Sequence, residues 1–147
     1  MKHEAVLTSK QASEVRGVTL ASGAKAMLLK DNASKLENMD SKVLYTLAVM
    51  SASKKFSWKL VKKLLRAKNI RFATVEEVQK VTGCLPGAVA PFGSAYGVST
   101  IVDESLGIQG ETINFNCGLR THSVRMMYKD YLAIEKPKLI SVFTEDG

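Results

Sequence analysis

A single lysine lies near the start of an otherwise apolar stretch, TLASGAKAMLLKD, which runs from Thr19 to Asp31 and has the length of a buried strand. An ammonium group that loses its water without gaining a partner is costly, so the side chain of Lys25 either extends to solvent or meets an anion. Taken alone, a lysine at a strand end more often extends to solvent. The chemistry that Lys25 offers is the binding of a negatively charged group.

The uncharged segment CLPGAVAPFGSAYG, from Cys84 to Gly97, is a second candidate, with three glycines and two prolines among small apolar residues. Glycine permits close approach of the backbone to another group, and proline stiffens the chain. A long loop of low polarity inside a compact domain is more often functional than disordered. A Gly/Pro-rich segment is also commonly just a turn, so both interpretations stay open at this point.

Positive charge is concentrated in one region of the chain. The formal net charge is +7, and the stretch from Ser41 to Val75 contains nine basic residues and no acidic residue. The rest of the chain has 12 basic and 14 acidic residues, so this region supplies the whole positive excess. Such a surface attracts phosphates, although charge patterning alone favours a solvated lysine-rich helix face.

Within that region, the segment SWKLVKKLLRAK predicts an amphipathic helix from Ser57 to Lys68. Trp58, Val61 and Leu65 form one apolar stripe, which Leu60 and Leu64 reinforce. The basic side chains lie away from that stripe: Lys59, Lys62, Lys63 and Arg66. The predicted helix therefore packs by one side and presents a basic face.

Local signals predict alternating helices and strands around these candidates. Thr74 as N-cap, Glu77 three residues later and Gly83 as C-cap delimit a helix, and a similar pattern predicts a short helix over residues 8–17. A further helix over residues 128–136 is stopped by Pro137. Strands are predicted over residues 24–31, 42–50, 70–72, 98–106, 111–116, 121–127 and 138–146, with a turn-forming segment over 31–41.

The last predicted hairpin contains a histidine. His122, Val124 and Met126 share one face of its second strand by period-two alternation, and Ser123 and Arg125 share the other. A lone histidine at a strand start is more often a hydrogen-bonded structural residue than a catalytic one.

A metal or thiol enzyme would have to use His3, His122, Cys84 and Cys117, and no pair of these has a ligand-like spacing. Cys84 follows a helix-capping glycine, which favours a buried structural thiol. No cofactor and no metal are expected.

Length and composition indicate an ordinary globular chain. The 147 residues suit one domain, 46% of them are hydrophobic and 24% charged. No apolar run is long enough to span a membrane, and the first residues lack the apolar core of a secretory signal. Two unpatterned cysteines fit a reducing compartment, so a cytoplasmic location is expected.

Several separated motifs, in order and at comparable spacing, resemble the YbaK family of aminoacyl-tRNA deacylases. This family includes the free-standing YbaK and ProX proteins and the editing domain of prolyl-tRNA synthetases. The resemblance extends from about Ala5 to Pro137, and a single glycine motif would not suffice for it. The motifs are RGVTLASGAKAMLLK, RFATVEEVQKVTGCLPGAVAPFG, VDESL and INFNCGLRTHSVRM.

The resemblance implies roles for individual residues. Lys25 matches the family's functional lysine, which engages the substrate near the terminal nucleotide and its phosphate. The span Gly87 to Pro91, GAVAP, matches a G-x-x-x-P loop whose main chain lines the aminoacyl pocket and helps to orient water. His122 aligns beside that pocket, where the resemblance implies contact with the substrate amine or carbonyl in preference to a general-base role. The remaining implied pocket residues are Ala88, Val89, Ala90, Asn116, Gly118 and Ser123.

The resemblance also implies the reaction, which is hydrolysis of the ester between a wrong amino acid and the terminal adenosine of tRNA. Alanine and cysteine on tRNA(Pro) are the family's usual targets, and serine differs from them by one small group. Hydrophobic pockets discriminate small apolar differences by only about 1–3 kcal/mol, so fidelity requires a second, hydrolytic site. The implied partners are mischarged tRNA and a prolyl-tRNA synthetase or synthetase complex.

The fold that the resemblance implies is a single α+β domain over residues 1–147. Its curved, barrel-like mixed sheet has about six strands and is flanked by helices. Whether the domain is free-standing or belongs to a synthetase stays open. The basic helix is expected to hold the tRNA acceptor stem. The alternative function is a catalytically silent tRNA-binding module, because electrostatic attachment needs the lysines of the helix but neither Lys25 nor the glycine loop.

Overall fold

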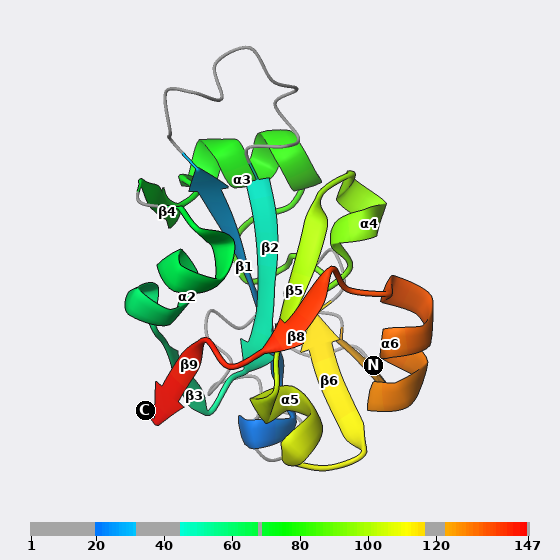
Figure 1. The fold of residues 1–147 in the computed structure, drawn as a ribbon. Helices are drawn as coiled ribbons and strands as arrows, with labels where there is room; N and C mark the ends of the chain where they lie inside the picture. Colours follow the sequence, from blue (N-terminus) through cyan, green and yellow to red (C-terminus); the bar gives the residue numbers. More distant parts are fainter. Residues whose placement is uncertain (1–19, 32–44, 68, 117–122, 147) are drawn as a thin grey trace.

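The computed structural model describes residues 20–31, 45–67, 69–116 and 123–146. A five-stranded mixed sheet forms the centre of the fold (Figure 1). The strands pair antiparallel from β4 to β1 and from β1 to β2, and parallel from β2 to β5 and from β5 to β8. In spatial order they are β4 (Ile70–Phe72), β1 (Ala24–Asp31), β2 (Tyr45–Ser51), β5 (Ser99–Asp103) and β8 (Leu139–Ser141).

Two further strand pairs complete the β structure. Strand β6 (Thr112–Asn116) pairs antiparallel with β7 (Ser123–Met127), and a parallel bridge between Gly23 and Asn114 joins this pair to the start of β1. Strand β3 (Lys54–Phe56) pairs antiparallel with β9 (Thr144–Asp146). The expected α+β class is confirmed. Among the residues described, the central sheet has five strands rather than about six and does not close into a barrel.

Helices flank the sheet, and α3 carries the caps that were predicted for it. The helices are α2 (Trp58–Leu65), α3 (Val75–Thr82), α4 (Gly93–Tyr96), α5 (Ser105–Ile108) and α6 (Tyr128–Glu135), with a 3₁₀ turn η1 (Leu20–Ser22) before β1. Thr74 and Glu77 form the predicted capping box of α3, and Gly83 ends it with a left-handed φ of 73°. None of the helices described is both long and apolar enough to cross a membrane.

The basic helix α2 is shorter than predicted. Ser57 caps its N-terminus by accepting a hydrogen bond from the Leu60 N–H, but the helix ends at Leu65 instead of continuing to residue 68. Arg66 adopts the left-handed conformation with φ 52°, and its N–H bonds to the Lys62 carbonyl, so the last turn closes there. Val61 is fully buried, which confirms the predicted apolar stripe.

Two hydrophobic clusters occupy the two faces of the central sheet because side chains alternate along each strand. On β1, Leu28 packs in the first cluster and Leu29 in the second. The first cluster includes Leu47, Val49, Val78, Val89, Val102, Ile113, Phe115 and Tyr131. The second includes Ala48, Met50, Val61, Ala67, Ile70, Ile101 and Phe143. Helix α2 therefore covers the face of β1 that carries Leu29.

The C-terminal segment is two strands, whereas the sequence predicted one continuous strand. Asp103, at the end of β5, is fully buried, and its carboxylate accepts hydrogen bonds from the Phe143 N–H (2.7 Å) and the Thr144 hydroxyl (2.8 Å). These bonds divert the chain from the central sheet toward β3. Asp103 also accepts the Ser105 N–H, which ends β5 earlier than predicted and starts α5.

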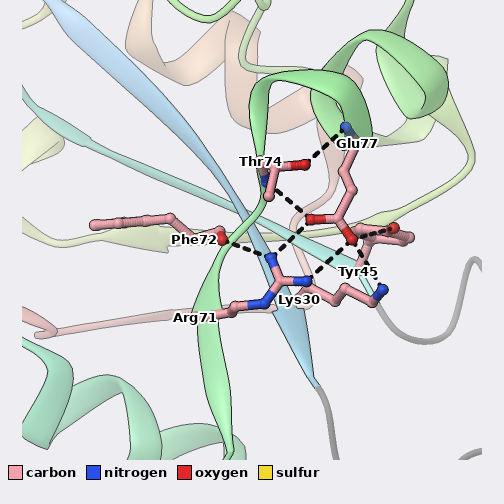
Figure 2. A network of polar contacts seen from close by, with 6 residues as sticks. All are labelled: Lys30, Tyr45, Arg71, Phe72, Thr74 and Glu77. Carbon is pink, nitrogen blue, oxygen red and sulfur yellow. Dashed lines mark hydrogen bonds and ion pairs between the residues drawn. The ribbon is translucent and has the colours of Figure 1, made fainter.

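A polar network ties β1, β2 and β4 to α3 (Figure 2). The Glu77 carboxylate accepts two hydrogen bonds from Arg71 (2.7 and 3.2 Å), one from the Thr74 N–H (2.8 Å) and one from the Tyr45 hydroxyl (3.2 Å). It also forms an ion pair with Lys30 at 2.8 Å. The bonds from Arg71, followed by that from Lys30, hold the pKa of Glu77 well below its ordinary value.

The predicted helix over residues 8–17 and the turn-forming segment after Asp31 lie outside the described residues. The other predicted elements occur at or near their expected positions. Strands β1 and β2 are neighbours, as predicted, and Ala24 of β1 lies opposite Ser51 of β2.

Candidate functional site

The segment Gly87–Pro91 runs along the first hydrophobic cluster. Gly87 is exposed and has a φ of 88°, in the left-handed region that favours glycine. Ala88, Val89, Ala90 and Pro91 are buried, and Val89 belongs to the first cluster. The uncharged stretch from Cys84 to Gly97 is therefore not one open loop. Helix α4 forms within it, and the part before that helix is packed against the core.

Side chains from other elements hold the main chain of this segment in place. The Asn116 side-chain amide, at the end of β6, donates to the Gly87 carbonyl at 2.7 Å. The Ala90 N–H donates to the Tyr96 hydroxyl at 3.0 Å. Backbone groups fixed in this way can act as preorganised dipoles toward a bound substrate.

Strand alternation orients Lys25 and Asn116 to the same side of the two segments that the Gly23–Asn114 bridge joins. The parallel bridge between Gly23 and Asn114 places Lys25 and Asn116 each two residues beyond it on neighbouring segments. On β1, Ala24 and Ala26 pack against the first cluster, as Ile113 and Phe115 do on β6. Because side chains alternate along a strand, Lys25 and Asn116 both point away from the first cluster. Asn116 thus connects the segment that carries Lys25 with the carbonyl of Gly87.

Other polar side chains lie on the same face of the β6–β7 pair as Asn116. Ser123 is buried and lies opposite Asn116, and Arg125 lies opposite Asn114 and donates to its side-chain oxygen at 3.3 Å. Met126, on the other face of β7, packs against the first cluster. This alternation agrees with the prediction for residues 123–126. His122 and Gly118 lie outside the described residues.

Asn116 also has an unused acceptor. Its amide nitrogen must point to Gly87, because a carbonyl oxygen can only accept, and this sets which end of the amide is the oxygen. The Oδ1 atom is buried and has no hydrogen-bond partner among the residues described. A buried acceptor without a partner is costly, so this atom is suited to receive a donor from a bound molecule.

The predicted basic face is present on α2. Val61 packs in the second cluster with Leu29 and Met50, and Met50 lies directly opposite Lys25. The basic helix and the lysine of β1 therefore lie on the same side of the central sheet. The exposed basic residues of this face are Lys59, Lys62, Lys63 and Arg66.

The thiol and metal interpretation gains no support from the described residues. The Cys84 thiol is partly buried and donates to the Thr82 carbonyl at 3.5 Å. Within the described ranges, no three His, Cys, Asp or Glu side chains are grouped so that they could hold a metal ion. His3 and Cys117 fall outside those ranges.

Of the two side chains that hold the candidate loop, Asn116 was predicted as a pocket residue from the sequence and Tyr96 was not. A tyrosine inside an uncharged, buried segment is the available signal, since a buried phenol needs a hydrogen-bond partner. The sequence does not show that the partner of the Tyr96 hydroxyl is the Ala90 N–H. This pairing depends on the turn that α4 introduces.

A family model and a related protein both match most of this chain. The family model described as "Aminoacyl-tRNA editing domain" matches residues 3–134. The multifunctional Ser/Thr-tRNA deacylase ProXp-y of Escherichia coli (strain K12) is 30% identical over 139 residues, which are 95% of this chain and 80% of that protein.

Solved structures share the fold. The structure of a hypothetical protein, APE2540, superposes with a TM-score of 0.81 at 18% identity, covering 99% of this chain and 89% of that one. A protein described provisionally as a trans-editing enzyme for prolyl tRNA synthetase superposes with a TM-score of 0.80 at 21% identity, covering 100% of this chain and 85% of the other.

Proposed function

This chain belongs to the family of aminoacyl-tRNA editing domains, and we propose that it removes serine or threonine from mischarged tRNA. It is an aminoacyl-tRNA deacylase, and its substrate is a mischarged tRNA. The choice of amino acid is supported by a relative of 30% identity that is named a Ser/Thr-tRNA deacylase. Alanine and cysteine, the targets that the YbaK resemblance implies, are the second candidates.

The proposed reaction is attack of water on the ester carbonyl between the amino acid and the terminal ribose. The carbonyl oxygen becomes an oxyanion in the tetrahedral intermediate, and the ribose hydroxyl leaves with a proton. We assign the main chain of Gly87 to Pro91 to orienting the water and the carbonyl, since its groups are held by Asn116 and Tyr96. Lys25 is assigned to the phosphate or the terminal nucleotide, and His122 to the substrate amine or carbonyl.

Asn116 supports a substrate with a hydrogen-bond donor. Its buried Oδ1 has no partner among the described residues and lies beside the Gly87 carbonyl that the same side chain binds. A serine or threonine hydroxyl would satisfy this acceptor, and an alanine methyl group would not. A site that hydrogen-bonds a substrate hydroxyl rejects the analogue that lacks it far more strongly than an apolar pocket rejects a methylene.

Replacing Asn116 by alanine is expected to lower the preference for seryl-tRNA over alanyl-tRNA by about tenfold, the free energy of one hydrogen bond in a buried site. The measurement is kcat/KM on tRNAs charged with serine, threonine, alanine and cysteine. Activity on every substrate also falls because Gly87 loses its donor, but that loss cancels in the ratio. The exposed Asn69→Ala is the control. A ratio that stays at the wild-type value contradicts the role of Asn116 in selection.

The basic face of α2 is proposed to hold the acceptor stem of the tRNA. Its lysines are exposed, and the helix covers the side of the sheet from which Lys25 projects. A backbone bound by several cations releases counterions, so the affinity falls steeply with salt. An exposed apolar stripe on α2 would favour a protein partner instead. As described, α2 has no such stripe, because Val61 is buried in the core.

Charge reversal on this face separates binding from chemistry. The variant Lys59→Glu, Lys62→Glu, Lys63→Glu is expected to raise the apparent KM by about tenfold or more at low salt, with a smaller effect as salt increases. The single-turnover rate at saturating enzyme should remain within about twofold of wild type. The control, Lys80→Glu, Lys129→Glu, Lys138→Glu, makes the same change in net charge at exposed lysines elsewhere. Equal effects in both variants would mean that α2 is only solvated surface.

The alternative of a silent tRNA-binding module predicts binding without hydrolysis. The panel of charged tRNAs distinguishes the deacylase from the binding module, because a binding module leaves every ester intact. As partners we propose a prolyl-tRNA synthetase or a synthetase complex, with the editing domain over residues 1–147 acting in trans or as an appended unit. The proposed compartment is the cytoplasm, where such tRNAs are charged.

A further inference from the structure

Helix α6 contacts the candidate loop through a tyrosine. The Tyr131 hydroxyl donates to the Pro91 carbonyl at 2.6 Å, and the side chain is fully buried. Its ring packs edge-on against Phe92, with centroids 5.1 Å apart. Burial, followed by the charge of Glu135, raises the pKa of Tyr131 far above its ordinary value, so the phenol stays protonated and remains a donor.

A glutamate one helical turn later on α6 binds the residues that follow the loop. Glu135 is buried, and its carboxylate accepts from the Ser94 hydroxyl (2.6 Å), the Ser94 N–H (3.2 Å) and the Thr100 hydroxyl (2.5 Å). The Thr100 oxygen in turn accepts the Gly93 N–H at 2.9 Å. Three hydrogen bonds converge on this one carboxyl group, so it anchors Ser94 and Thr100 to α6.

The close fit around this anchor leaves no room for adjustment. A Cβ atom at Gly93 would collide with the Thr100 hydroxyl and would lie 2.8 Å from the Val98 carbonyl oxygen. The end of the loop at Pro91 and the start of α4 are therefore both attached to α6.

We propose that Tyr131 and Glu135 are positioning residues for deacylation, which hold the main chain of Gly87 to Pro91 in its reactive geometry from the Pro91 end. This inference rests on the proposed function, in which that main chain orients the water and the ester. Neither side chain contacts the substrate in this proposal. They act through the Pro91 carbonyl and through Ser94, at 40 and 41 residues' separation in the sequence.

The test compares Tyr131→Phe and Glu135→Gln with the wild type under saturating substrate. Each variant keeps the shape of the side chain, so tRNA binding and KM should stay near the wild-type value. We expect kcat to fall by about tenfold or more, because displacement of catalytic groups by about 1 Å can cost two orders of magnitude. Hydrogen exchange measured on peptides that span residues 88–94 should become faster in both variants.

Asp103→Asn is the matched control for a purely structural effect. Asp103 is also a buried carboxylate that accepts backbone and hydroxyl donors, but its partners Ser105, Phe143 and Thr144 belong neither to the candidate loop nor to α6. This variant should lower the melting temperature while kcat, measured well below that temperature, stays within about twofold of wild type, since Asp103 shares no hydrogen-bond partner with Tyr131 or Glu135.

Two results would overturn the inference separately from the proposed function. An active wild type whose Tyr131→Phe and Glu135→Gln variants keep the wild-type kcat refutes positioning and leaves the proposed function intact. A kcat loss in Asp103→Asn equal to theirs would assign the effect to general stability. A wild type that hydrolyses none of the charged tRNAs overturns the proposed function and, with it, this inference.

Discussion

Replacing Lys25 by alanine is expected to lower kcat/KM for the hydrolysis of mischarged tRNA by up to about a hundredfold, because a hydrogen bond to a charged group contributes about 1.5–3 kcal/mol. Lys25 lies near the start of β1, two residues after Gly23, which is bridged to Asn114 of β6. Among the residues described, none forms an ion pair with its ammonium group. Its charge is therefore available to a phosphate or to the terminal nucleotide of the substrate.

The conservative variant separates charge from shape. Lys25→Arg keeps the cation and should retain more activity than Lys25→Ala, although a guanidinium differs from an ammonium in geometry. Lys138→Ala removes an exposed lysine elsewhere and should leave kcat/KM within about twofold of wild type. Deacylation by Lys25→Ala at the wild-type rate, with normal affinity for tRNA, would remove Lys25 from the site.

Replacing Glu77 by glutamine is expected to lower the free energy of unfolding by about 2 kcal/mol at about pH 7. The carboxylate accepts bonds from Arg71, Thr74 and Tyr45 and pairs with Lys30, so it joins three strands to α3 (Figure 2). Because the Arg71 side chain is 39% exposed, solvent screening reduces its share of this stabilisation. Urea unfolding of the wild type and the variant measures the difference.

The stabilisation by Glu77 also depends on pH. Its pKa in the folded chain lies below that in the unfolded chain, so the stabilisation is complete above the unfolded pKa. It declines as the pH falls from the unfolded pKa of about 4.3 toward the folded pKa. The difference between wild type and Glu77→Gln should therefore shrink in acid.

The neighbouring Glu76→Gln is a matched control for Glu77. Glu76 lies in the same first turn of α3 but is exposed, and its replacement should change the free energy of unfolding by less than about 0.5 kcal/mol. A Glu77→Gln variant as stable as Glu76→Gln would show that the network contributes nothing.

The features of this protein that depend on local interactions could be predicted from its sequence. The capping box of Thr74 and Glu77, the end of α3 at Gly83 and the apolar stripe of α2 involve residues a few positions apart. The same holds for the alternation that assigns Ser123 and Arg125 to one face of β7. The family and the reaction were likewise predicted from motifs that stand in order along the chain, and the matches to known proteins confirm them.

Contacts between distant residues decided the rest. The break between β8 and β9 depends on Asp103, about 40 residues earlier in the chain, because a buried carboxylate captures whichever donors the fold brings to it. The attachment of Gly87 to Asn116 and of Pro91 to Tyr131 likewise needs segments that only the packed sheet and α6 bring together. The sequence determined which residues were available for the site. The tertiary structure determined which hydrogen-bond partners these residues have, since hydrogen-bond geometry depends on position in space and not on spacing along the chain.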